Sequence, residues 1–339
     1  MPTDEVGLEE LLSEPTPALI DAMGRLVGDI MVLGAAGKMG PSLCRMALRA
    51  SRLAGSARRV IAVARFADPA TRQVLEDVGV RTVVADLVDP AALATLPDAP
   101  NVVFMAGRKF GTDDDIAATW ATNAYLPGLV AERFAKARIV AFSTGNVYPL
   151  TPLRDGGSRE TDAAGPIGTY AQSALAREGV LEFQSRRLGT PMTILRLNYA
   201  IEPRYGVLRD IADKVWRGER VDLGMGYVNV IWQRDANAVA LRAFDRCTSP
   251  PAVLNVTGRP AIAVRELARR FGVRFKRDVH LHGLEAPTAL LSDSARCELL
   301  FGPPPVAVDE MIELVAGWVE QGGRSLDRPT HFQQRDGHF

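Results

Sequence analysis

The stretch "DIMVLGAAGKMG", residues 29–40, constrains the fold of this chain more than any other part of the sequence. A short apolar run leads directly into three glycines, Gly34, Gly37 and Gly40, and "PSLCRMALRA" follows with helical spacing. Glycines allow backbone N–H groups to approach a pyrophosphate at the positive end of a helix. This strand–turn–helix arrangement predicts a dinucleotide site that includes Lys38 and Met39; a plain tight turn is the alternative.

Apolar runs and helical patterns then alternate along the chain, and the runs include "RRVIAVAR", "VRTVVADL", "NVVFMAG", "ARIVAFST" and "TPMTILRL". Such alternation is typical of a parallel sheet with helices on both faces. We therefore expect an α/β fold with a Rossmann-like doubly wound parallel sheet over residues 29–198. A helical leader, residues 1–28, precedes it. A smaller C-terminal α/β substrate lobe, residues 199–330, follows and is partly interleaved with it, and a frayed polar tail, residues 331–339, ends the chain.

Composition excludes several classes of function. The formal net charge is zero, so no global field attracts nucleic acid or an anionic membrane surface. The N-terminus is acidic rather than basic, unlike a signal peptide, and no apolar run approaches the roughly 20 residues of a membrane span. The three cysteines are widely spaced, which suits a reducing compartment. We expect a cytoplasmic protein that binds neither nucleic acid nor membrane.

The residue at the end of the second apolar run bears on the choice of cofactor. In NAD-binding sites of this kind an acidic residue at that position binds the ribose 2′-hydroxyl. This chain has Arg65 there instead. A guanidinium suits the 2′-phosphate of NADP, so NADP is slightly favoured within a general NAD(P) prediction. The alternative is that Arg65 is an ordinary surface arginine.

Further motifs follow along the chain: the glycine turn, Asp86, "FMAG" (104–107), Asn123, "FSTGNVY" (142–148), "YAQSALARE" (170–178) and "ILRL" (194–197). Together they resemble the extended (atypical) short-chain dehydrogenase/reductases of the NAD(P)-dependent epimerase/dehydratase family. The resemblance implies an oxidoreductase, epimerase or dehydratase that moves a hydride to or from a nicotinamide. It also implies a carbohydrate-like small molecule as substrate: a sugar, a nucleotide sugar or a sugar-acid derivative.

The same resemblance assigns catalytic roles. Tyr170 matches the family's acid/base and Thr144 matches the hydroxyl residue that orients the substrate oxygen. The family's lysine, four residues after the tyrosine, is replaced by Ala174. A lysine there lowers the pKa of the tyrosine, because a nearby cation favours tyrosinate. Without that role, Tyr170 would be a buried structural tyrosine and Thr144 a strand-end hydroxyl bonded to backbone.

Three explanations of Ala174 stay open. Lys109 or Arg108, in the loop after the fourth strand, could supply the missing charge, unless Lys109 simply faces solvent. The reaction could instead be altered, with Tyr170 acting as a neutral acid. Or redox catalysis could be lost, which would leave a non-catalytic NAD(P)-binding regulator or scaffold.

The resemblance also implies contacts to ligands. For the cofactor it adds Asp86 and Leu87 at the adenine, and Ala106, Gly107, Asn123 and Tyr170. For the substrate it suggests Lys109, Thr144, Asn146, Asn198 and Tyr199. Asp86 could instead cap the next turn, and Asn123 could be a polar residue within its helix. The segment "LNYAIEP" (197–203) departs from the family pattern, which leaves the substrate class open.

The sequence predicts no metal site. His280 and His282 alternate on one face of a probable strand without a third ligand, and the acidic run at residues 113–115 starts a helix, where negative charge complements the helix dipole. Helices around 116–136 and 170–188 have apolar residues beyond one narrow stripe, and by analogy we expect them to form a homodimer interface. These residues are Trp120, Tyr125, Leu126, Leu129, Leu181 and Phe183. Burial of these side chains inside a single chain is the alternative.

Overall fold

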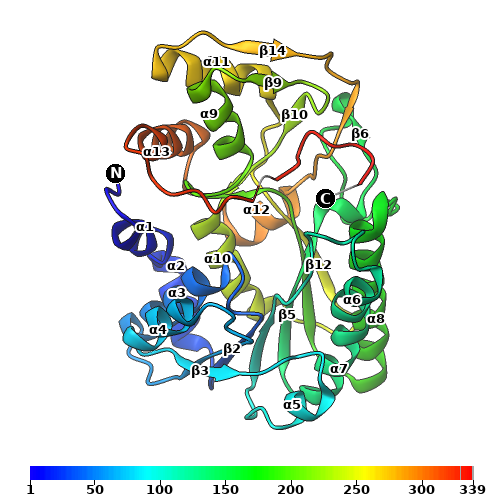
Figure 1. The fold of residues 1–339 in the computed structure, drawn as a ribbon. Helices are drawn as coiled ribbons and strands as arrows, with labels where there is room; N and C mark the ends of the chain where they lie inside the picture. The colour runs from blue at the N-terminus through cyan, green and yellow to red at the C-terminus, as the bar shows by residue number, and fades with distance from the viewer. Residues whose placement is uncertain (329, 338–339) are drawn as a thin grey trace.

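A computed structural model describes residues 1–328 and 330–337, and within these residues a seven-stranded parallel sheet forms the centre of the protein (Figure 1). The strand order is β12-β7-β5-β4-β1-β2-β3. The strands are β1 (Ile30–Leu33), β2 (Val60–Ala64), β3 (Arg81–Val84), β4 (Asn101–Phe104), β5 (Arg138–Thr144), β7 (Met192–Leu197) and β12 (Ala252–Val256). The order reverses between β1 and β4, so their carboxyl ends form the crevice where such sheets bind ligands. The predicted doubly wound α/β fold is confirmed.

Helices cover both faces of this sheet because the strands bury both sets of alternating side chains. Val32 of β1 packs with one face and Met31 with the other, and both are fully buried. The first face is covered by α2 (Pro17–Arg25), α3 (Gly40–Leu53), α4 (Pro69–Asp77) and α10 (Gln233–Arg242). The second face is covered by α5 (Pro90–Ala94), α7 (Leu126–Arg133) and α8 (Gly168–Leu188).

The connection from β4 to β5 contains an irregular helix. It runs as α6 (Ile116–Trp120), a π-helical turn η1 (Ala121–Tyr125) and α7. Pro127 lies in the first turn of α7 and lacks the N–H that an ordinary α-helix would direct at the carbonyl of Asn123. Single π turns of this kind are frequent at functional sites.

A second core forms what we call the small lobe, built around α9 (Val207–Arg217), α11 (Val264–Phe275) and α13 (Val308–Glu320). Short strand pairs complete it: β8 (Ala200–Ile201) with β11 (Ile231–Trp232), β9 (Arg220–Asp222) with β14 (His280–His282), β10 (Tyr227–Val228) with β13 (Ile262–Ala263), and β6 (Thr151–Pro152) with β15 (Thr288–Ala289). Helix α12 (Ala295–Phe301) follows β15, and the 3₁₀ turns are η2 (Gly145–Val147), η3 (Leu153–Asp155) and η4 (Ala243–Arg246). Strand β12, although it follows residue 199, belongs to the large sheet.

Both ends of the chain pack on the body. In the leader, α1 (Glu5–Leu12) buries Leu8 and Leu12 in the small-lobe core, while α2 packs on the sheet side. The tail was expected to be frayed, and for residues 331–337 this expectation is wrong. Phe332 is buried in the small-lobe core and Arg335 donates a hydrogen bond of 2.8 Å to the carbonyl of Thr288. The tail crosses between the two lobes (red in Figure 1), and residues 338–339 lie outside the described part.

In the described part of the chain, every helix is too short or too polar to cross a lipid bilayer.

Candidate functional site

The glycine-rich turn joins β1 to α3, and two of its glycines have no room for a side chain. A Cβ on Gly34 would lie 2.6 Å from the backbone nitrogen of Ala106, and its φ of +91° also favours glycine. A Cβ on Gly40 would lie 2.1 Å from the carbonyl oxygen of Ala35. Gly37 is less constrained, because its Cβ would meet only the carbonyl of Gly34 at 3.4 Å. The first N–H groups of α3 receive no side-chain cap, which fits them to bind a pyrophosphate.

Lys38 and Met39 of this turn point into the protein. Met39 is buried in the core beside the sheet. The half-buried Lys38 side chain extends toward the small lobe, where its Nζ donates a 2.7 Å hydrogen bond to the carbonyl of Ala200 and lies 4.5 Å from the ring centroid of Tyr205. Burial lowers the pKa of Lys38 to about 7, against the opposing charge of Glu202.

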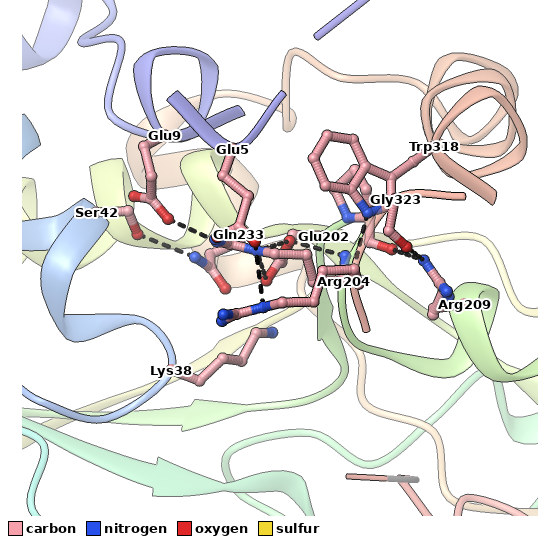
Figure 2. Close-up of polar contacts among 12 residues, drawn as sticks. Glu5, Glu9, Lys38, Ser42, Glu202, Arg204, Arg209, Gln233, Trp318 and Gly323 are labelled. Carbon is pink, nitrogen blue, oxygen red and sulfur yellow. Dashed lines mark hydrogen bonds and ion pairs between the residues drawn. The ribbon is translucent and has the colours of Figure 1, made fainter. Parts of the chain in front are cut away.

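Behind Lys38 a buried ion cluster ties the leader to the small lobe (Figure 2). The Nε of Arg204 lies 3.1 Å from Glu202, whose side chain is fully buried, and another guanidinium nitrogen lies 2.6 Å from Glu9 of α1. Glu5, also on α1, is 3.7 Å from the same arginine. The charged groups beside the glycine turn therefore come from two distant parts of the chain, helix α1 and the start of the small lobe.

The predicted adenosine contacts lie past the ends of β2 and β3, the two strands that follow β1 in the sheet. Arg65 follows β2 directly and is exposed. Asp86 is exposed and accepts a 3.2 Å hydrogen bond from the N–H of Val88, which is the capping role kept open from the sequence. Leu87 is buried in the core of the second sheet face.

Asn123, in the π turn, connects the loop after β4 to α8. Its side chain accepts from the N–H of Arg108 and donates to the carbonyl of Arg108, each at 2.8 Å. It also donates to the hydroxyl of Ser173 on α8 at 2.9 Å. These bonds fix the loop that contains Ala106 and Gly107 at the carboxyl edge of the sheet.

Thr144 and Tyr170 meet at the same edge. Thr144 is the last residue of β5, and its hydroxyl accepts from the N–H of Asn146 at 3.2 Å and from Nδ2 of Asn146 at 3.1 Å. Tyr170 lies in the first turn of α8 and forms a side-chain hydrogen bond with Thr144. Burial raises the pKa of Tyr170, while the charge of Arg177 and the bond from Thr144 oppose that rise.

The structure adds Arg177, which the sequence analysis missed. Its guanidinium is buried and donates to the carbonyl of Phe142 at 2.7 Å and to Oδ1 of Asn123 at 2.9 Å. Ala174, one turn before it, is 2% exposed and packs with Val147 and Tyr148. The signal was present in the sequence, since residues seven apart share a helix face.

Arg108 and Lys109, the two cations proposed from the sequence to replace the missing lysine, lie in the loop after β4. Arg108 donates to the carbonyl of Gly111 at 3.0 Å and lies 4.0 Å from Asp115. Lys109 is half-buried; burial lowers its pKa to about 8, and Asp210 of the small lobe opposes this.

The predicted substrate residues after β7 differ in their surroundings. Asn198 is buried and its Nδ2 donates to Oδ1 of Asn229 at 2.9 Å. Tyr199 is half-buried with a φ of +45°, unusual for a residue with a side chain, and burial raises its pKa. Burial also raises the pKa of Tyr205, which the sequence analysis missed, and the nearby Asp210 and Tyr170 act in the same direction.

Among residues 1–328 and 330–337, no three histidine, cysteine or acidic side chains gather as a metal site would require. His280 and His282 are exposed on β14. Asp115 accepts from the N–H of Ala118 at 2.9 Å and so caps α6.

Comparisons with known proteins agree with this geometry. Residues 30–215 match the NAD dependent epimerase/dehydratase family. No curated protein matches the chain in sequence. Solved structures that it resembles include UDP-glucuronic acid 4-epimerase from Bacillus cereus in complex with NAD, with a TM-score of 0.73 and 17% identity over 86% of this chain and 99% of that one.

Two UDP-glucose 4-epimerases are similar as well. The Thermus thermophilus enzyme, in complex with NAD, has a TM-score of 0.71 and 18% identity over 85% of this chain and 98% of that one. The Thermotoga maritima enzyme, with UDP-glucose, has a TM-score of 0.70 and 18% identity over 87% and 99%. The family match covers more than half of the sequence, and the chain therefore belongs to the NAD dependent epimerase/dehydratase family.

Proposed function

We propose that this enzyme epimerises or dehydrates a sugar nucleotide, or a related sugar or sugar acid, with Tyr170 as the acid/base. The observation that carries the proposal is the placement of Tyr170, in the first turn of α8, beside Thr144 at the carboxyl edge of the sheet, where β5 ends. The glycine turn after β1 opens at the same edge, so a dinucleotide on that turn would extend toward the phenol.

The chain's own groups would divide the work as follows. NAD(P), when bound, would supply the acceptor for a hydride from the sugar carbon. Tyr170 would take the proton of the substrate hydroxyl at its phenolic oxygen and later return it. Thr144 and Asn146 would hold that substrate oxygen, and Lys109 would meet an anionic part of the substrate. Asn123, Ala106 and Gly107 would position the wall of the cofactor site.

The bare N-terminus of α3, with Gly34 and Gly40 beneath it, would bind the pyrophosphate. Arg65 and Asp86 would lie near the adenosine ribose and the adenine. The similar structures contain NAD, whereas the exposed guanidinium of Arg65 suits a 2′-phosphate, so both dinucleotides belong in the first binding assay.

A homodimer through α6, α7 and α8 is part of this proposal. Exposed apolar side chains lie on α6, the π turn and α8, with Trp120 38%, Tyr125 55% and Phe183 62% exposed. Leu126 and Leu181, also expected at this interface, are instead buried in the core of the chain. Light scattering should give twice the chain mass, and Phe183→Glu should give the monomer. A monomeric wild type would overturn the dimer.

The catalytic proposal is tested by incubating the protein with NAD or NADP and each of UDP-glucose and UDP-glucuronic acid, and identifying products by proton NMR. We expect a stereoisomer or a dehydrated sugar to accumulate with one of them, and transient absorbance of reduced cofactor. If a dinucleotide binds tightly but no sugar nucleotide or free sugar turns over, the enzyme assignment to this substrate class fails. The chain would then act as a dinucleotide-binding regulator.

A further inference from the structure

Arg177 lies on the face of α8 that carries Tyr170. The two residues are seven apart, which is two helical turns. Side chains on a helix lean toward its N-terminus, so the long arginine side chain extends back across the level of Ala174, three residues earlier. Ala174 is buried and has only a methyl group, so position 174 itself provides no charge on this face.

The surroundings of Arg177 are shaped for a guanidinium. A Cβ on Gly107 would lie 2.8 Å from one of its terminal nitrogens, so a larger residue in this loop would displace the guanidinium. Its Nε donates to the carbonyl of Asn123 at 3.3 Å, the carbonyl to which Pro127 offers no α-helical N–H. Oδ1 of Asn123 and the carbonyl of Phe142 each accept a hydrogen bond from one of its terminal nitrogens. The π turn therefore provides an acceptor for the Arg177 side chain, and Gly107 leaves room for its guanidinium.

The charge of Arg177 acts on the phenol, and the neighbouring carboxylate, Glu178, has an ion-pair partner of its own. Arg177 donates to the carbonyl of Phe142, and Tyr170 lies beside Thr144, two residues further along β5, so both side chains reach the same end of that strand. The adjacent Glu178 is paired with Arg196 at 2.7 Å, and Arg196 in turn bonds to the hydroxyl of Tyr148. Tyr170 and Glu178 are the titratable groups that act on Arg177.

We propose that Arg177 is a positioning residue that supplies, from the second turn after Tyr170, the positive charge that a lysine at position 174 would have given. The proposal rests on the proposed role of Tyr170. It also differs from the candidates in the sequence, because Lys109 and Arg108 lie in the loop after β4 and Arg177 lies on α8 itself.

The test measures the titration of the phenol directly. Fluorotyrosine is incorporated at position 170 alone, and its ionisation is followed by fluorine NMR in the full chain. Replacing Arg177→Gln removes the charge and keeps N–H donors, and it should raise the titration midpoint by about one pH unit or more. Arg177→Lys keeps the charge and should hold the midpoint near that of the parent. Adding Ala174→Lys to Arg177→Gln should restore it.

Arg58→Gln is the matched control. Arg58 is also buried and also donates to backbone carbonyls, those of Gly28 at 2.8 Å and Met23 at 3.0 Å, but it lies away from α8. It should lower stability without moving the midpoint. Should Arg177→Gln not fold, Arg177→Met fills a similar volume and takes its place, alone and with Ala174→Lys.

An unchanged midpoint in the charge-removing variant, or one that moves equally in Arg58→Gln, would overturn the proposal. The titration needs neither substrate nor cofactor, so its outcome is separate from the activity assay. Where turnover is found, kcat of Arg177→Gln should fall about tenfold at neutral pH with KM unchanged, and its pH optimum should become more alkaline. A loss confined to KM would contradict the assigned role.

Discussion

Lys38 in the glycine turn and Ala200 at the start of the small lobe are joined by a 2.7 Å hydrogen bond from the lysine Nζ to the alanine carbonyl. This bond links the predicted pyrophosphate site to the lobe expected to hold the substrate. It also places a lysine in surroundings that lower its pKa to about 7.

Replacing Lys38→Met should change how stability depends on pH. The unfolded chain keeps this proton up to a pH near 10.5, whereas the folded protein releases it near 7. Between these values the unfolded state holds more protons, so the free energy of unfolding of the wild type should rise with pH relative to the variant. Allowing for partial exposure, the gain should be about 1–2 kcal/mol. Urea unfolding at several pH values measures this change, with Lys136→Met as the control. A free energy of unfolding that falls with pH relative to the variant would contradict the burial argument.

Gly34→Ala should lower both stability and dinucleotide affinity. The new Cβ would lie 2.6 Å from the backbone nitrogen of Ala106, and φ is +91°, so the cost should be about 3 kcal/mol or more. Gly55→Ala is the matched control, since Gly55 also has positive φ but nothing within 4 Å of the added Cβ. Thermal unfolding and calorimetric titration with NAD compare the two. Equal losses in both variants would show that contact with the loop after β4 is unimportant.

Arg65→Asp should shift the cofactor preference toward NAD. A guanidinium bonded to a 2′-phosphate contributes about 1.5–3 kcal/mol, so the ratio of NADP to NAD affinity should fall at least about tenfold. Dissociation constants for both dinucleotides, measured in wild type and variant, give that ratio. A ratio that does not change would identify Arg65 as a surface arginine.

Arg204→Met should destabilise the fold strongly because it leaves the carboxylate of Glu202, which is fully buried, without its 3.1 Å partner. Removing one member of such a pair costs about 3–5 kcal/mol. Adding Glu202→Met to the same chain removes the unpaired charge and should recover much of the loss. Urea unfolding of the two variants decides this; a double variant less stable than the single one would contradict it.

The parallel sheet could be predicted because its strands are continuous apolar runs separated by helical patterns. Strand β12 was harder, since "AVLNV" follows a long stretch of small-lobe sequence and only its pairing with β7 places it in the large sheet. Non-local pairing leaves no mark in the local pattern. The prediction of a frayed tail failed for a similar reason. The tail is mostly polar, but it includes Phe332, which is buried in the small-lobe core.

In the site, the glycine turn, Thr144 and Tyr170 could be located because their spacing is local and chemically distinctive. Arg177 could not be singled out by matching position 174 alone. Its role depends on the direction of a long side chain, the π turn and a glycine in another loop, which only the folded chain brings together. Lys38 was expected at the cofactor, and its bond to Ala200 depends on how the two lobes close.

The most direct test of the account is the turnover rate of the Tyr170→Phe variant on whichever sugar nucleotide the wild type converts, with dinucleotide affinity measured on the same preparation. The account predicts that kcat falls by about 10²–10⁴-fold while the cofactor still binds as in the wild type, because only the proton-transferring hydroxyl is lost. A phenylalanine variant that turns over at the wild-type rate would contradict it.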